Sequence, residues 1–159
     1  MAHSKLRQEL KKRRDFDSPE QEATLNLLRT NDQVQIRLAR LFREFGLTPA
    51  QYNILRILRG AGEPLPILEI ASRTVTVVPG ITGLIDRLES AGHVCRKRCA
   101  EDRRVVRVSI TEQALAALVR LDEPLLALQR TLMGHLSRSE LRELSRLLEK
   151  VREPLATEG

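Results

Sequence analysis

Apolar residues recur at helical spacing along most of the chain. Val34, Leu38, Leu41 and Phe45 lie three or four residues apart, which predicts one apolar helix face. Ser-Pro and Thr-Pro pairs begin two of these segments, and glycines end most of them. The pattern predicts helices over residues 18–45, 48–59, 66–73, 78–91, 111–133 and 137–155.

Alternating polarity marks a β-hairpin between residues 94 and 110. Val106, Val108 and Ile110 alternate with Arg107 and Ser109, so the second strand has one apolar and one polar face. The predicted strands are 94–99 and 105–110, joined by a loop at 100–104. A helix, a turn at 74–77, a further helix and a hairpin follow one another as in a winged helix-turn-helix, with helix 78–91 as the recognition helix.

The predicted fold is therefore mainly α with a small β-hairpin wing. A basic N-terminal arm, residues 1–17, precedes one domain over residues 18–159. Within that domain a winged-helix lobe occupies about residues 48–111. Dimerisation helices are predicted at about 18–45 and 112–155.

The last two helices carry leucine ladders with a strict three-four alternation. Their apolar positions are Leu118, Leu121, Leu125, Leu128, Leu132, Leu141, Leu144, Leu148, Val151 and Leu155. So narrow a stripe is typical of helix pairing. It favours a homodimer over the alternative, in which both helices cover the domain's own core.

Composition favours a polyanionic partner. Lys and Arg number 27 against 21 Asp and Glu, giving a net charge of +6 and a pI near 10.0. No apolar run reaches the roughly 20 residues that span a bilayer. The N-terminus lacks the apolar segment of an export signal, and two cysteines fit a reducing cytoplasm. Aromatic residues, at 3%, are too scarce to favour stacking on single strands.

Helix 78–91 offers a small polar face for the major groove of double-stranded DNA. Its candidate DNA-contacting residues, with the turn before it, are Thr76, Pro79, Gly80, Thr82, Gly83, Asp86 and Arg87. A threonine can hydrogen-bond to base edges or contact a thymine methyl. Gly80 and Gly83 would let the backbone approach the duplex closely, although close packing inside the protein is the alternative explanation.

The hairpin is the second candidate DNA-binding element. Arg96 and Arg98 lie in its first strand, and Asp102, Arg103 and Arg104 lie in its loop. An arginine at a hairpin tip can enter a narrow minor groove, and Asp102 could hold it through a charge-assisted hydrogen bond. A solvated charged turn is the alternative, but the position after a helix-turn-helix pattern favours DNA.

Three stretches of the chain resemble the MarR family of bacterial transcription regulators. They are LTPAQYNIL at 47–55, IDRLESAG at 85–92 and EDRRVVRVSIT at 101–111. The resemblance implies a homodimer that binds a pseudo-palindromic operator, usually as a repressor. It also implies that Arg104 enters the minor groove with Asp102 as its orienter, and that residues 79–87 form the reading edge.

Many members of this family release DNA when a small aromatic or phenolic ligand binds between the dimerisation region and the DNA-binding lobe. In this chain Arg43, Tyr52 or Arg56 would line that cleft. Two positions depart from the family pattern: Gly83 stands where relatives often carry a polar or basic reader, and Ala114 where they usually have glycine.

Other classes of function find less support. Cys95 and Cys99 could make the chain a thiol-based redox regulator, but about 13 Å of strand separates them and a disulfide needs Cα atoms within roughly 7 Å. Some winged helices bind proteins instead of DNA, which the basic wing disfavours. The sequence shows no catalytic constellation, no metal-ligand pattern and no cofactor motif, so we expect neither an enzyme nor a cofactor.

Overall fold

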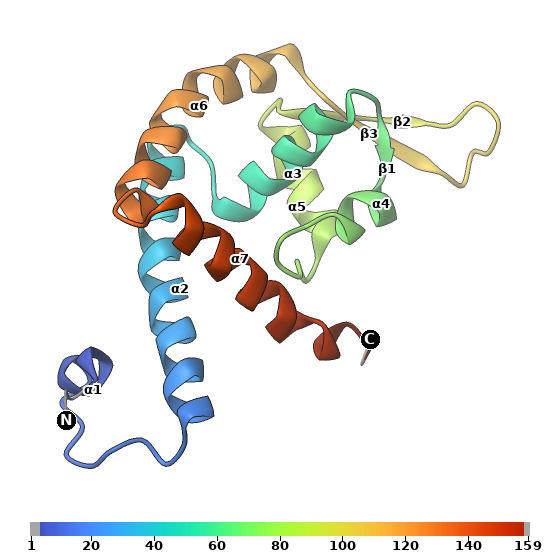
Figure 1. The fold of residues 1–159 in the computed structure, drawn as a ribbon. Helices are drawn as coiled ribbons and strands as arrows, with labels where there is room; N and C mark the ends of the chain where they lie inside the picture. The colour runs from blue at the N-terminus through green and yellow to red at the C-terminus, as the bar shows by residue number, and fades with distance from the viewer. Residues whose placement is uncertain (1–3, 158–159) are drawn as a thin grey trace.

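The computed structural model describes residues 4–157 and is mostly helical with one small sheet (Figure 1). The elements, in chain order, are α1 (Lys5–Glu9), α2 (Pro19–Glu44), α3 (Pro49–Ala61), β1 (Leu65–Pro66), α4 (Ile67–Ser72), α5 (Ile81–Ser90), β2 (Val94–Arg98), β3 (Val106–Ile110), α6 (Glu112–Met133), α7 (Arg138–Arg152) and a 3₁₀ turn, η1 (Pro154–Thr157). This confirms the predicted fold class.

Helix ends follow the predicted local chemistry at most positions. Thr48 and Ser137 each form a reciprocal capping box at the start of α3 and α7. Gly62 ends α3 in the left-handed conformation, at φ +68°. The expectation that Gly60 also stops this helix is wrong, because α3 continues through Gly60 to Ala61.

The sheet has one strand more than the sequence pattern predicts. Its order is β1-β3-β2, with all neighbours antiparallel. Val94 faces Ile110 and Arg98 faces Val106, and the loop spans residues 99–105. Each strand of the hairpin is therefore one residue shorter than predicted. Strand β1 contains only two residues, which is too short to show alternation, and its Pro66 suits an edge strand.

The winged-helix lobe and α6 share one hydrophobic core. Its fully buried side chains are Ile54, Leu55, Leu58, Ile70, Ile85, Leu88, Val108, Leu118 and Leu121. The first half of the α6 ladder therefore covers the chain's own core, which corrects the prediction that this ladder serves dimerisation throughout. In contrast, Leu144, Leu147 and Val151 of α7 are exposed, and no residue of α7 is buried.

Thr111 joins three elements at the base of the hairpin. Its backbone N–H donates to His93 O at 3.0 Å, and its hydroxyl donates to Gly92 O at 2.7 Å. The same hydroxyl accepts the Ala114 N–H at 3.3 Å and so caps α6. Thr111 thereby connects the end of α5, the start of β2 and the start of α6.

The N-terminal segment lies beside the first half of α2, at the opposite edge of the molecule from the hairpin (Figure 1). Leu6 of α1 is buried, and Glu9 accepts a hydrogen bond from Arg29 of α2 at 2.8 Å. Part of the segment expected as an arm is therefore helical. Residues 1–3 of that arm and residues 158–159 lie outside the described residues. Within residues 4–157, no helix is long and apolar enough to cross a membrane.

Candidate nucleic-acid interface

Helix α5 presents one face to the core and the other to solvent. Leu84, Ile85 and Leu88 are buried, whereas Thr82 and Arg87 are exposed. The first turn of α5 carries no acidic side chain. No side chain caps the N–H groups at the start of this helix. An amphipathic helix held in this way can offer a neutral-to-basic edge to a nucleic acid.

The recognition helix begins later than its apolar pattern predicts, at Ile81 instead of Val78. Val78 precedes Pro79, and a residue before proline disfavours the α conformation. Gly80 then adopts the left-handed region at φ +67°, from which a right-handed helix cannot continue backwards. Pro79 and Gly80 therefore lie in the loop that leads into α5, together with the exposed Thr76.

The structure excludes close intramolecular packing as the reason for glycine at 80 and 83. A Cβ built at either position meets no heavy atom within 4 Å. Gly80 is explained by its positive φ. Gly83 lies in the regular helix α5 and faces open space, so its missing side chain leaves room for an external surface.

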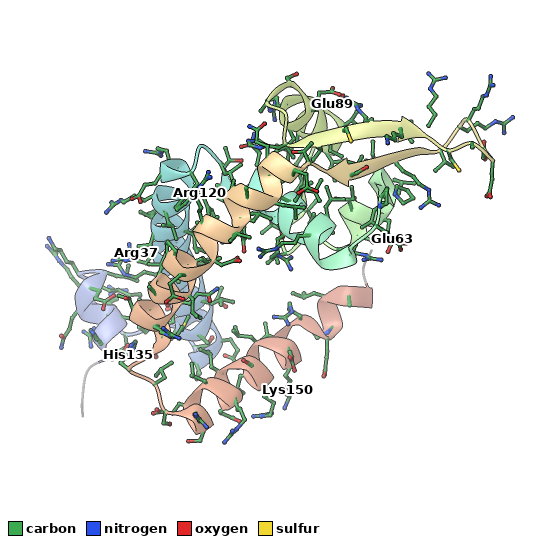
Figure 2. All side chains as sticks on the ribbon, turned by 90° about the horizontal axis from the view of Figure 1, so that it is seen from above. Arg37, Glu63, Glu89, Arg120, His135 and Lys150 are labelled. Atoms are coloured by element: carbon green, nitrogen blue, oxygen red, sulfur yellow. The ribbon has the colours of Figure 1, made fainter. Side chains whose placement is uncertain are left out.

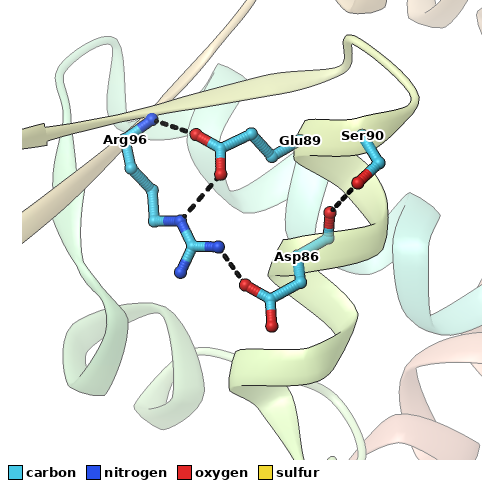
Figure 3. Close-up of polar contacts among 4 residues, drawn as sticks. All are labelled: Asp86, Glu89, Ser90 and Arg96. Atoms are coloured by element: carbon cyan, nitrogen blue, oxygen red, sulfur yellow. Dashed lines mark hydrogen bonds and ion pairs between the residues drawn. The ribbon is translucent and has the colours of Figure 1, made fainter.

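Two residues predicted to contact DNA are instead engaged with each other (Figure 3). The guanidinium of Arg96 on β2 donates to Asp86 on α5 and, through Nε, to Glu89 Oε2 at 3.0 Å. The Arg96 backbone N–H donates to Glu89 Oε1 at 3.0 Å. The hydrogen bonds that Arg96 donates to Asp86 and Glu89 raise the pKa of Arg96 above its ordinary value. This network joins the wing to the recognition helix.

The wing tip exposes its charged side chains. Asp102, Arg103 and Arg104 are all exposed, and side chains ending in nitrogen surround the tip of the hairpin in Figure 2. Asp102 Oδ1 accepts the backbone N–H of Arg104 at 3.0 Å. The predicted contact between Asp102 and an arginine thus uses the backbone of Arg104 and leaves its guanidinium facing solvent.

Further cations flank the same hairpin. Lys97 and Arg98 at the end of β2 are exposed, and Arg107 on β3 donates from Nη1 to Pro64 O at 3.3 Å. Lys97 and Arg107 were not among the residues predicted to contact DNA. Their positions on the strands next to the tip extend the basic surface along the hairpin.

Both cysteines are free thiols on this hairpin. The Cys95 thiol donates to the Ser109 hydroxyl oxygen at 3.7 Å on the neighbouring strand. At Cys99 the backbone N–H groups of Asp102 and Glu101 lower the pKa of the thiol. Across residues 4–157, His, Cys, Asp and Glu side chains do not gather in groups of three that could hold a metal ion.

The three residues expected to line a ligand cleft have different surroundings. Arg43 lines a pocket of about 330 Å³ between the end of α2 and the start of α3, whose other lining residues are Ala39, Gly46, Leu47, Thr48 and Pro49. Tyr52 stacks on Phe42 with ring centroids 4.3 Å apart, and burial raises the pKa of its hydroxyl. Arg56 donates to Asn53 Oδ1 at 2.8 Å.

Sequence reasoning missed the ion pair that links the lobe to the long helix α6. Arg59 of α3 donates from Nη1 and Nη2 to the two carboxylate oxygens of Asp122, each at 2.9 Å. The partners are 63 residues apart, and no local pattern in the chain indicates their pairing.

Exposed apolar residues before α5 were also missed. Leu68 on α4 is 84% exposed, and Val75 and Val77 in the following loop are 80% and 92% exposed. The available signal was the composition of residues 74–79, TVTVVP, which is richer in valine than an ordinary turn.

The comparison with known sequences identifies the lobe. The sequence pattern of the MarR family matches residues 47–106, from the start of the lobe into β3. An HTH-type transcriptional regulator of Bacillus cereus is 32% identical over 128 residues, which cover 80% of this chain and 84% of that protein.

Solved structures extend the similarity to most of the chain. A MarR transcription factor from Planctomyces limnophilus is 44% identical, with a TM-score of 0.65, covering 85% of this chain and 98% of its own. A variant of MarR from E. coli, solved in complex with operator DNA, is 25% identical with a TM-score of 0.76, covering 87% of this chain and 99% of its own. From the lobe geometry and these relatives, we conclude that this chain belongs to the MarR family of DNA-binding transcription regulators.

Proposed function

We propose that this protein is a dimeric repressor that binds a pseudo-palindromic operator with two copies of the winged-helix lobe. The observation that carries the proposal is the pairing of two exposed elements on one lobe. Helix α5 is anchored by its apolar face, and the hairpin beside it ends in Arg103 and Arg104, which face solvent. An α-helix fits the major groove, and an arginine fits the narrow minor groove next to it.

The Arg96 network supports the use of both elements on one duplex. It holds β2 to α5 through Asp86 and Glu89, so that the wing and the recognition helix keep a defined spacing. A preorganised spacing lowers the conformational cost of binding two grooves at once.

Exposed apolar side chains support the dimer. An apolar groove of about 430 Å³ lies between the first half of α2 and α7, and Leu27, Leu144, Leu147 and Val151 are among its lining residues. These four side chains are exposed in the single chain. A second copy of the chain would remove them from water.

The pocket beside Arg43 supports release by a small ligand. It lies where the lobe begins and α2 ends, so that its occupant would touch both regions. An organohalide-sensing regulator with the same fold, RdhR-CbdbA1625, was solved with 2,4-dichlorophenol bound. For this chain we propose the same class of ligand, a small phenolic compound. Its oxygen would contact Arg43.

The test is a salt titration of duplex binding with two matched variants. Arg104→Ala should weaken binding on the order of tenfold and lower the slope of log affinity against log salt by about one. Arg120→Ala, which removes the same charge from α6 away from the hairpin (Figure 2), should leave affinity and slope unchanged. Equal affinities for wild type and Arg104→Ala would contradict the role of the wing tip.

A further inference from the structure

The most exposed large apolar residues of the described chain lie on α4 and in the loop between α4 and α5. Val77, Leu68 and Val75 are 92%, 84% and 80% exposed, more than any other large hydrophobic side chain in residues 4–157. Their neighbours Ile70, Val78 and Ile81 turn inward and pack in or against the core. The outward valines therefore contribute nothing to the chain's own folding core.

The surroundings of these valines are almost uncharged. Between residues 73 and 83 the only charged side chain is Arg73, and its guanidinium lies 2.7 Å from the carboxylate of Glu69. The hydroxyls of Thr76 and Thr82 are exposed and form no hydrogen bond with any residue that the structure describes. Gly80 and Gly83 have no side chains, so the surface does not protrude at these two positions.

Exposed arginines lie on other elements of the same lobe. Arg87 on α5 and Arg98, Arg103 and Arg104 on the hairpin are exposed and suit phosphates. A duplex offers partners for both kinds of side chain, because its major groove lies between two phosphate backbones. The only apolar group on base edges in that groove is the C5-methyl of thymine.

We propose that Val75 and Val77 read thymine methyl groups in the major groove and so determine which operators the protein prefers. This inference rests on the proposed function and specifies how its site chooses a sequence. It explains why a chain without a polar side chain at Gly83 can still be selective: part of the discrimination comes from methyl contacts instead of base-edge hydrogen bonds. Each half-site should therefore contain thymines facing the loop before α5.

The test removes one methyl group at a time from the DNA. The full-length protein first selects bound duplexes from a random library, and each thymine of the selected half-site is then replaced by uracil. We expect one or two of these replacements to weaken binding roughly three- to tenfold, because each removes a single buried methyl group. Replacements elsewhere in the duplex should have no effect.

Methyl-free variants connect the effect to the two valines. Val75→Ser and Val77→Ser remove both side-chain methyl groups, and both sites are too exposed for folding to depend on them. In the variant that lacks the valine facing a given thymine, thymine and uracil should bind equally well at that position. Val119→Ser on α6, at a side chain that is 67% exposed, is the matched control and should keep the full uracil penalty.

The outcomes separate this inference from the proposed function. If the wild type binds selected duplexes but uracil has no effect at any position, or the penalty persists in both serine variants, the thymine contacts are refuted and DNA binding stands. If no duplex is retained, both proposals fail. If Val77→Ser changes only the oligomeric state and not the response to uracil, the apolar surface serves a protein contact and the inference is overturned.

Discussion

At Gly83 a methyl group added to the helix would meet no heavy atom within 4 Å. Gly60 in α3 has the same property and also lies within a helix at an ordinary backbone conformation. Glycine inside a helix costs about 0.5–1 kcal/mol of stability relative to alanine. Both positions therefore carry a residue that the fold itself does not require, and only Gly83 lies on the recognition helix.

We expect Gly83→Ala to increase the free energy of unfolding by about 0.5–1 kcal/mol and at the same time to weaken operator binding. The added methyl would stand between the helix backbone and the DNA. Gly60→Ala should give the same gain in stability with unchanged DNA affinity. Denaturant unfolding and fluorescence anisotropy with a labelled duplex measure the two effects. Full affinity in Gly83→Ala would show that the backbone does not approach the bases there.

Between elements, the Arg96 network adds a side-chain connection on the DNA-binding side. Strand β2 and helix α5 are neighbours in sequence, and the guanidinium of Arg96 joins them through Asp86 and Glu89 (Figure 3). Since these charges are partly exposed, the stability that they add is modest, about 1 kcal/mol or less. Their more important effect is on the angle between the wing and the recognition helix.

The variants Arg96→Gln and Arg98→Gln should therefore weaken DNA binding in different ways. Arg98 is exposed, so its loss should lower the salt slope of DNA binding by about one without changing the melting temperature. Loss of Arg96 should leave the salt slope unchanged, lower the melting temperature slightly and weaken binding through misplacement of the wing. Salt titrations and thermal melts of both variants distinguish these roles. A reduced salt slope in Arg96→Gln would instead make Arg96 a phosphate contact.

Local chemistry predicted most elements, and long-range contacts account for most of what it missed. The cap residue Thr48 and the alternation from Val106 to Ile110 depend only on near neighbours, so both were visible in the sequence. Strand β1 exists because Leu65 pairs with Val108, more than 40 residues away. The contacts of Arg96 and Arg59 likewise depend on how elements meet in space. From residue type alone, Arg96 was predicted to contact DNA, and no contact was predicted for Arg59.

On the scale of the whole molecule, the two leucine ladders have different roles. Leu118 and Leu121 of α6 are fully buried in the single chain, whereas Leu144 and Leu147 of α7 are exposed. The sequence could not separate them, because both ladders have the same periodicity. Only the placement of α6 against the lobe core decides which ladder remains available to a second copy.

We expect Leu144→Asp combined with Leu147→Asp to give folded monomers, because neither side chain is part of the chain's own core. Circular dichroism should retain the helical signal, and analytical ultracentrifugation should report half the mass of the wild type. Leu68→Asp, at a more exposed leucine of the lobe, should remain dimeric. A double variant that stays a dimer would place the contact between copies elsewhere.

The hydrogen bonds of Thr111 couple the orientation of α6 to that of the recognition helix. Its hydroxyl is bonded both to the carbonyl that follows the recognition helix and to the first turn of α6. Helix α6 has 22 residues and is therefore about 33 Å long. Because Leu118 and Leu121 fix the first half of α6 in the lobe core, helix and lobe turn together. A rotation of about 10° about Thr111 would displace the far end of α6 by about 6 Å. In the proposed dimer, small adjustments where the two chains meet would thus change the separation between the two recognition helices.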